Sequence, residues 1–325
     1  MTRRALICGV GGQDGAYLAQ LLSGKGYAVT GTSRNAAGAS TDGLAALGIE
    51  GKVHVVSMSP SDYDSVRRTI VEAQPDEIYN LAGQSSVGLS FEQPVGAVQS
   101  NAIGALNVLE AVRTIAKPIR VFNAGSGECF GDTGGSPATE ATPMRPRSPY
   151  AVAKTCAFHL VANYREAYRL HACTGILFNH ESPIRPDRFV TRKIIGAALR
   201  IADGSKEVLS LGNLDIDRDW GWAPDYVEAM WLMLQQDTPA DFVIATGRSV
   251  SLEYFVDRTF RAAGLDWRDH VKQDKSLFRP SDIRFSVGLP ERIHAELGWK
   301  ARTDVDGVID AMCRSTRGFE KAVRL

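Results

Sequence analysis

The sequence is poor in cysteine and contains no long apolar run. Its five cysteines are scattered, and none belongs to a CxxC pair or to a Cys/His cluster with zinc spacing. We therefore expect reduced thiols and assign no metal site. No run of about 18 apolar residues occurs, which argues against a transmembrane helix. The apolar start at Ala5–Cys8 meets glycines too soon for a signal peptide, so we expect a cytoplasmic protein.

Net charge is also missing. The 37 lysines and arginines balance 37 aspartates and glutamates over 325 residues. Nucleic-acid and membrane-surface proteins usually carry a basic excess, so we expect neither partner. Hydrophobic residues make up 44% and charged residues 23%, which is typical of a globular chain, and the length suggests about two domains.

Short apolar runs alternate with amphipathic stretches in the first half. The expected strands are 5–8, 28–33, 53–56, 77–81, 119–122 and 175–178. The expected helices are 15–25, 62–72, 98–115 and 150–170. Strands that are apolar on both faces and alternate with helices predict an α/β fold with a doubly wound, parallel, Rossmann-type sheet.

The alternation loosens after about residue 178. Helices at 190–202, 226–235 and 252–263 mix there with short strands such as 242–245. This change predicts a first domain over 1–178 and a smaller mixed α/β domain over 179–325, interleaved with the last strands of the sheet.

A glycine-rich segment lies between the first strand and the first helix. Gly9, Gly12 and Gly15 give the spacing GxxGxxG, a variant of the dinucleotide-binding fingerprint. Such glycines allow a tight turn and let the backbone approach a pyrophosphate at the helix N-terminus. A glycine-rich loop can also be a plain turn, but its place between a strand and a helix favours a nucleotide.

The second strand is expected to end near the adenosine ribose. An acidic residue there favours NAD, whereas arginine accommodates the 2′-phosphate of NADP. The segment Thr30–Asn35 contains no acid but has Arg34, which favours NADP unless Arg34 is only a solvated surface charge.

Tyr150 and Lys154 lie one helical turn apart, on one face of an expected helix. An ammonium group beside a phenol favours the phenolate, so we expect a lowered pKa that makes Tyr150 a usable base.

The preceding strand leads into Ser126 and Glu128. Residues at the carboxyl end of a parallel strand point into the ligand crevice. There Ser126 could hold a substrate hydroxyl, and Glu128 could transfer a second proton that simple alcohol oxidation would not require. Glu128 could alternatively be a loop residue that caps a helix.

These motifs together resemble the extended short-chain dehydrogenase/reductase superfamily, and within it the GDP-mannose 4,6-dehydratase family. The similarity spans nearly the whole chain. It includes 12–15, 78–81, 147–150, 175–183, 189–194, 212–215, 218–221, 225–235 and 241–247.

The resemblance implies an NADP-dependent lyase that converts GDP-mannose to GDP-4-keto-6-deoxymannose. Tyr150, with Lys154 and Ser126, would remove the 4-hydroxyl proton as hydride leaves C4. Glu128 would then remove the C5 proton, water would leave from C6, and the hydride would return to C6. Residues 1–178 would bind NADP and 179–325 the nucleotide sugar.

The resemblance also implies two sets of binding residues. The cofactor set is Gly9, Gly12, Gln13, Asp14, Gly15, Arg34, Ser57, Met58, Leu81, Ala82, Gly83, Tyr150, Lys154, His180 and Arg185. The substrate set is Ser85, Asn179, Arg185, Val190, Lys193, Arg218, Arg279 and Asp282.

Several positions depart from the family pattern. Ser126 replaces a threonine, Ser57 an aspartate near the adenine, and Gly96 a tyrosine near the cofactor. Ile184 and Asp217 replace basic residues expected near the diphosphate. Residues 35–51 lack the arginine-rich loop of tetrameric relatives, so we expect a homodimer, formed by the helices that begin near Val98 and Tyr150, rather than a tetramer.

Three alternatives stay open. A GDP-sugar 4-reductase or 4-epimerase of the same superfamily would keep Tyr150 and Lys154 but would not need Glu128. A dehydratase for another nucleotide sugar would keep all three residues. A non-catalytic NADP-binding regulator could lose any of them.

Overall fold

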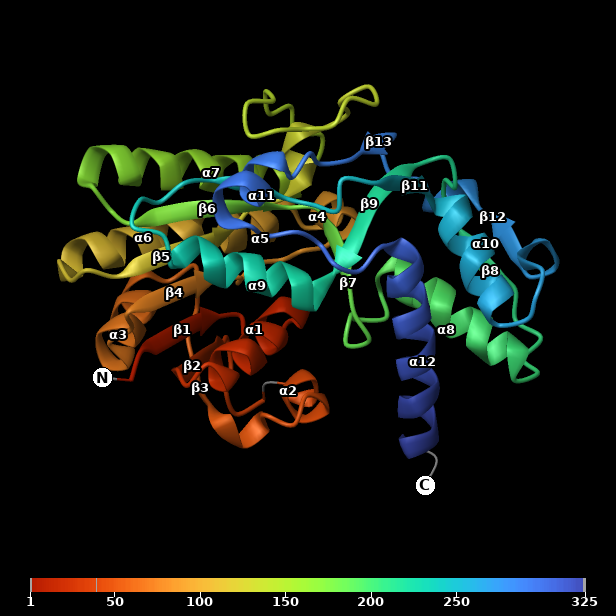
Figure 1. Cartoon of the computed structure of the whole chain (residues 1–325), viewed down its shortest axis with the longest axis horizontal. Helices are drawn as coiled ribbons and strands as arrows, with labels where there is room; N and C mark the ends of the chain where they lie inside the picture. The colour runs from red at the N-terminus through yellow and green to blue at the C-terminus, as the bar shows by residue number, and fades with distance from the viewer. Residues whose placement is uncertain (1, 39, 324–325) are drawn as a thin grey trace.

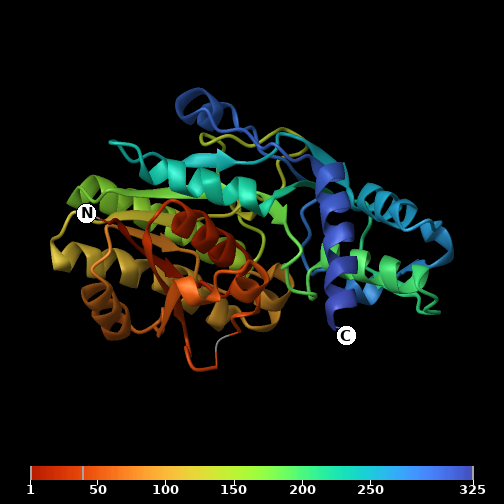
Figure 2. The same cartoon turned by 60° about the horizontal axis from the view of Figure 1, so that its bottom comes forward.

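The computed structural model describes residues 2–38 and 40–323. A seven-stranded sheet forms one end of the molecule, and a smaller group of helices and short strands forms the other (Figure 1). The view after a 60° turn shows the same two parts, with the C-terminal helix standing between them (Figure 2).

Every strand pair of the large sheet is parallel, in the order β10-β6-β5-β4-β1-β2-β3. The predicted doubly wound α/β fold is confirmed. The strands are β1 (Arg4–Cys8), β2 (Ala28–Ser33), β3 (Val53–Ser57), β4 (Glu77–Asn80), β5 (Arg120–Ala124), β6 (Ala172–Leu177) and β10 (Phe242–Ile244).

Helices cover both faces of this sheet. One face carries α1 (Gln13–Gly24) and α9 (Ala223–Leu234). The other carries α3 (Tyr63–Ala73), α6 (Gly104–Ile115) and α7 (Pro149–Tyr168). Shorter helices lie in the connections: α2 (Asp42–Ala46), α4 (Val87–Glu92), α5 (Pro94–Val98) and α11 (Glu291–Leu297).

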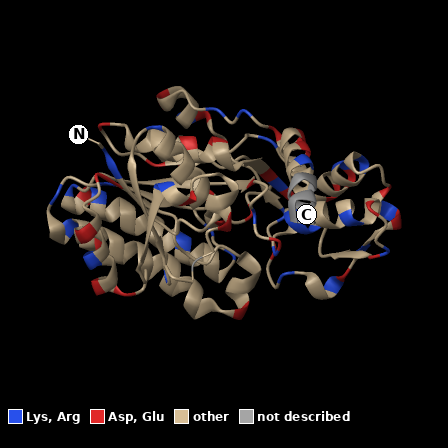
Figure 3. Ribbon diagram, turned by 90° about the horizontal axis from the view of Figure 1, so that it is seen from below, with Lys and Arg blue, Asp and Glu red and all other residues tan. Residues whose placement is uncertain are grey.

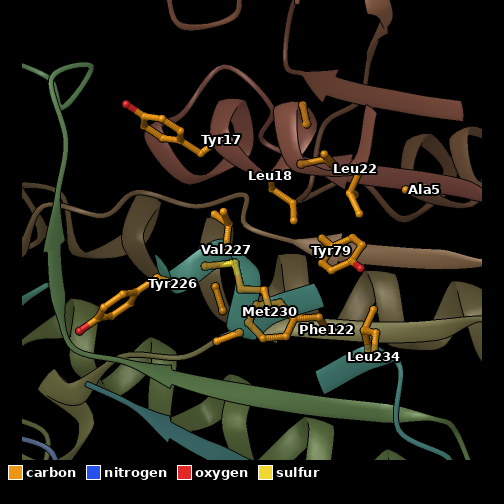
Figure 4. Packing of buried hydrophobic residues seen from close by; sticks show 14 of the residues in the cluster. Ala5, Tyr17, Leu18, Leu22, Tyr79, Phe122, Tyr226, Val227, Met230 and Leu234 are labelled. Carbon is orange, nitrogen blue, oxygen red and sulfur yellow. The ribbon is translucent and has the colours of Figure 1, made fainter. Parts of the chain in front are cut away.

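The strand sequences explain the two layers. In β1, Ala5 and Ile7 belong to the core under α1 and α9, whereas Leu6 and Cys8 belong to the core under α3, α6 and α7. Successive side chains of a strand point to opposite faces, so a continuous apolar run fills both cores. In the first core, Leu18 of α1 approaches the sheet beside Tyr79 (Figure 4).

The smaller part has a separate apolar core. Its helices are α8 (Val190–Ala202), α10 (Leu252–Ala262) and α12 (Val305–Val323), and its buried side chains form one cluster. One small sheet contains β7 (Asn179–Glu181), β9 (Asp217–Trp222), β11 (Ser249–Ser251) and β13 (Phe285–Ser286), and a second pairs β8 (Leu209–Leu211) with β12 (Val271–Gln273).

Two helical features differ from the expectations. The predicted helix over 98–115 is interrupted by a π-helical segment, Gln99–Ile103, before α6 begins. Helix α12 was not predicted, although Val305, Val308 and Met312 of one stripe are buried. The domain boundary after residue 178 stays a prediction; α9 and β10, which come later in the chain, pack with the large sheet.

No helix in the described part of the chain is long and apolar enough to cross a membrane. Acidic and basic residues are both scattered over the described part of the ribbon (Figure 3).

Leu18→Ala should lower the free energy of unfolding by about 2–5 kcal/mol, because Leu18 is fully buried and its removal leaves a cavity under α1. Urea denaturation measures the change. Val71→Ala, at a site 45% exposed, is the control and should cost less than about 1 kcal/mol. Equal losses would contradict this view of the core.

Candidate active site

A cleft of about 400 Å³ opens at the carboxyl ends of the sheet strands, between the large sheet and the smaller part. Its walls come from the turn after β5, the start of α7, β7, the start of α8, β9 and the segment 277–282. This is the edge at which open α/β sheets bind ligands.

The four proposed catalytic residues, Ser126, Glu128, Tyr150 and Lys154, all line this cleft. Ser126 caps the short 3-10 helix Gly127–Phe130, and its Oγ accepts a hydrogen bond from the Glu128 amide at 3.3 Å. The side chain of Ser148 caps α7, which holds Tyr150 and Lys154 one turn apart in the wall of the cleft.

The expected lowering of the Tyr150 pKa is wrong for the protein without ligands. Burial raises the pKa of Tyr150 above its usual value. The Lys154 ammonium lies 5.8 Å from the centre of the phenol ring and donates to the Ala124 carbonyl oxygen at 2.8 Å. Burial also lowers the pKa of Lys154, to about 8. Desolvation of both groups therefore outweighs their attraction.

All eight residues assigned to the substrate by resemblance also line the cleft: Ser85, Asn179, Arg185, Val190, Lys193, Arg218, Arg279 and Asp282. They come from five separate segments that the fold brings together.

Arg218 is the most deeply buried cation of that set, at 4% exposure. Its guanidinium lies 3.3 Å from Asp282, which is 3.7 Å from Arg279. Burial lowers the pKa of Arg218, and the charges of Glu128 and Asp282 oppose that change. Arg218 therefore brings positive charge close to the proposed base Glu128.

Arg185 packs its guanidinium over the ring of Phe189 at 3.8 Å, and its Nε lies 3.3 Å from the buried carboxylate of Glu181. Arg188, which the sequence analysis did not assign, also lines the cleft. Its place in the same segment, 183–189, was the available signal, because anion sites gather arginines.

The glycine-rich loop fits a dinucleotide. Gly9 has a φ of +86°, and a Cβ there would lie 3.0 Å from the Ala82 backbone. A Cβ on Gly15 would lie 2.5 Å from the Gly9 carbonyl oxygen. No side chain caps the N-terminus of α1 at Gly12, so its first amides are left for an anion.

The other assigned cofactor residues surround this loop. Arg34 is exposed at the end of β2, Ser57 ends β3, and buried Met58 follows it. Residues 81–83 follow β4, and Leu81 lines the cleft. Among residues 2–38 and 40–323, none bonds the Nδ2 of Asn123, which is buried near the end of β5, and this suits a site completed by a ligand.

Asp14 and His180 join the glycine loop to β7. The His180 Nε2 lies 2.9 Å from both carboxylate oxygens of Asp14. Burial alone would raise the pKa of Asp14 and lower that of His180, but the pair's attraction and hydrogen bonds reverse both effects, and the pKa of Asp14 falls to about 2. Gln13 completes the connection through hydrogen bonds to Asp14, the His180 carbonyl and Ser182.

Two departures from the family pattern lie beside residues of the cleft wall. Ile184 precedes Arg185 and packs against the core next to Gly43 of α2. Asp217 of β9 is paired with Ser251 of β11, its carbonyl oxygen accepts a hydrogen bond from Arg218, and its charge acts on that guanidinium.

Two other departures lie near the cofactor loops. Ser57 accepts a hydrogen bond from the Ala36 amide, and Gly96 lies in α5. The segment that lacks the arginine-rich loop folds back on its own chain: α2 packs on α1, and Leu44 is buried in the core.

The sequence comparisons agree with this geometry. The family model for GDP-mannose 4,6 dehydratase matches residues 6–312. The chain belongs to this family. It is 45% identical to GDP-mannose 4,6 dehydratase 1 of Arabidopsis thaliana over 99% of this chain and 88% of the relative. It is 41% identical to GDP-mannose 4,6-dehydratase of Sinorhizobium fredii over 98% of both chains.

Solved structures share the fold. A UDP-glucose 4-epimerase from Thermus thermophilus in complex with NAD has a TM-score of 0.85 at 25% identity, covering 97% of this chain and 99% of that one. A dTDP-glucose 4,6-dehydratase from Bacillus anthracis in complex with NAD has a TM-score of 0.85 at 19% identity, covering 98% of each chain. These likenesses support the extended dehydrogenase/reductase architecture.

Lys154→Met should change how stability depends on pH. The pKa of Lys154 is about 8 in the folded protein and about 10.4 in an unfolded chain. Between these pH values the unfolded chain holds the proton and the folded one does not. The unfolding free energy of the wild type should therefore rise with pH relative to Lys154→Met, by at most about 1.4 kcal/mol per pH unit.

Urea denaturation of the ligand-free protein from pH 7 to 10 measures this difference. Lys52→Met, at an exposed site, is the matched control and should follow the wild type at every pH. Parallel curves for wild type and Lys154→Met would show that burial does not perturb Lys154.

Proposed function

We propose that this protein is a hydro-lyase that converts GDP-mannose to GDP-4-keto-6-deoxymannose and water. Membership of the GDP-mannose 4,6 dehydratase family supports the reaction. The observation that carries it is the presence of Glu128 in the same cleft as Tyr150 and Lys154. Oxidation at a carbinol needs one base, whereas elimination needs a second group to remove the C5 proton.

A bound nicotinamide cofactor would accept hydride from C4 of the sugar and return it to C6. Gly9, Gly12 and Gly15, with the amino end of α1, would hold its diphosphate. Solved relatives of the same fold bind NAD or NADPH, which supports this class of cofactor.

Two side chains, Tyr150 and Glu128, carry out the two proton transfers. Tyr150 takes the proton of the 4-hydroxyl, which Ser126 holds by a hydrogen bond. Burial raises the pKa of Tyr150, and the nearby charge of Arg185 opposes that rise. Lys154, one helical turn away on α7, would add positive charge beside the phenolate in its protonated form. The 4-ketone acidifies the C5 proton, and Glu128 removes that proton and passes it to the C6 hydroxyl, which leaves as water. When hydride is returned to C6, C5 takes up a proton that has exchanged with solvent, which replaces the one that Tyr150 removed from the 4-hydroxyl.

The remaining cleft residues bind and orient the substrate. Arg218, Arg279 and Lys193 offer cations for a diphosphate, to which a guanidinium can make paired, charge-assisted bonds. Ser85 lies in the wall of the cleft and would contact the hexose. Burial of Arg218 and its contact with Asp282 keep its guanidinium oriented before substrate arrives.

A 4-reductase or 4-epimerase is the weaker alternative. The fold does not separate it from a dehydratase, because a solved 4-epimerase shares the architecture. Such enzymes need Tyr150 and Lys154 but have no elimination step, so they would leave Glu128 without a role.

We further propose that the protein is a cytoplasmic homodimer. Cys8, Cys129, Cys156 and Cys173 are free thiols, which suits a reducing compartment. Exposed apolar side chains on the helices at 94–115 and on α7, namely Val95, Val98, Ile103 and Val152, offer a surface for a second copy.

Glu128→Gln should lower kcat with GDP-mannose by about 10²–10⁴-fold, the range for loss of a general base. The affinity for NADPH should change less than about threefold, because Glu128 acts on the sugar. The assay follows the product in D₂O by NMR, where the wild type should incorporate deuterium at C5.

The control is Glu166→Gln, at an exposed site on α7, which should keep full activity. A wild-type enzyme that returns a 4-epimer or a 4-reduced sugar would exclude the dehydratase. Turnover of a UDP- or CDP-sugar but not GDP-mannose would retain the mechanism and reject the substrate.

We propose NADP rather than NAD as the cofactor, because Arg34 is exposed where the 2′-phosphate would lie. Arg34→Ala should weaken NADPH binding by about tenfold or more, the order expected for one charge-assisted contact, and leave NADH binding within about twofold. Fluorescence titration of both nucleotides tests this. An equal loss for both would assign Arg34 another role.

A further inference from the structure

Asp14 places a carboxylate where the proposed function needs an anion site. It lies in the first turn of α1, whose amino end would hold the cofactor diphosphate, and it lines the cleft. The helix dipole favours one negative charge there, but a free carboxylate would repel a bound diphosphate. The site therefore requires a neutralising partner for Asp14.

His180 is placed to be that partner. Its Nε2 lies 2.9 Å from both oxygens of Asp14, and its Nδ1 lies 2.7 Å from the Phe178 carbonyl oxygen. Both ring nitrogens thus face groups that only accept hydrogen bonds. A neutral imidazole carries one N–H, whereas the imidazolium ion carries two, so this geometry selects the charged form of His180.

The groups around Asp14 and His180 are consistent with a charged His180. From α9, the Tyr226 ring stacks on His180 at 4.4 Å with an interplanar angle of 25°. The cations that act on the pair are Arg185, after β7, and Lys154, on α7. Glu181, the other carboxylate on β7, is bonded to Thr191 and paired with Arg185. Asp14 is thus the anion that His180 contacts directly.

We propose that His180 is the built-in counter-ion of Asp14, and that this ion pair is what allows the amino end of α1 to accept the cofactor diphosphate. The inference rests on the dinucleotide site of the proposed function. Both residues are positioning residues in this role: Asp14 ties the glycine loop to β7 through His180 and Gln13, and His180 cancels the charge that this link introduces.

If His180 cancels the charge of Asp14, the two single variants should differ in their affinity for NADPH. His180→Gln leaves Asp14 ionised and unpaired, so NADPH binding at pH 7 should weaken at least about tenfold. Asp14→Asn removes the anion and keeps an acceptor for His180, so binding should stay within about threefold of the wild type. The double variant, which has no charge on either residue, should recover to within about threefold of Asp14→Asn.

Fluorescence titration of the purified full-length protein with NADPH measures these affinities without turnover, and thermal denaturation checks that each variant is folded. His171→Gln is the matched control: His171 bonds the Gln236 carbonyl and does not line the cleft, so its loss should leave NADPH affinity unchanged.

A pH series gives a second, independent readout. As the pH rises through the raised pKa of His180, the imidazolium loses its charge and Asp14 becomes uncompensated. Wild-type affinity for NADPH should therefore fall with rising pH more steeply than that of Asp14→Asn, whose remaining fall would come from Lys154, with its pKa of about 8. This comparison needs no His180 variant and decides the matter if His180→Gln does not fold.

Three outcomes would overturn the inference. One is wild-type affinity in His180→Gln. Another is a double variant as weak as His180→Gln. The third is the same pH profile in wild type and Asp14→Asn. If the wild type binds neither NADPH nor NADH at any pH, the proposed function fails, and the inference fails with it.

Discussion

Parallel pairing of the strands is the constraint on which the site depends. Because β1, β4, β5 and β6 run in the same direction, the loops that follow them all leave at one edge of the sheet. The glycine loop, residues 81–83 and the Ser126 turn are thereby brought together, although they are far apart in sequence. Each crossover must pass through a helix, and α7 is the crossover that also carries Tyr150 and Lys154.

Local patterns were sufficient to predict the sheet, the glycine loop and the pair on α7, because each depends on residues close together in sequence. Helix α12 could also have been predicted, since its apolar residues recur at helical spacing. The π-helical segment could not. It coincides with Asn101, whose side chain donates to the carbonyl oxygens of Ala97 and Gln84, and the bond to Gln84 spans 17 residues and is not visible in a local pattern.

The electrostatics of the site were the least predictable part. Adjacency of Tyr150 and Lys154 suggested a lowered phenol pKa, but the sequence does not reveal how completely both groups are desolvated. The contact between Asp14 and His180 joins positions 166 residues apart and depends on how β7 turns toward the glycine loop. The sequence motifs therefore identify which ionisable side chains are present, whereas their burial and contacts in the folded protein set their pKa values.

The route of the chain also limits how the protein can be divided. Strand β10 adds to the edge of the large sheet beside β6, and α9 buries Val227 and Met230 in the core beneath α1. A fragment that ended near residue 178 would expose this apolar face and leave β6 as an unpaired edge. The large sheet thus cannot be completed during synthesis until β10, which ends at Ile244, has left the ribosome.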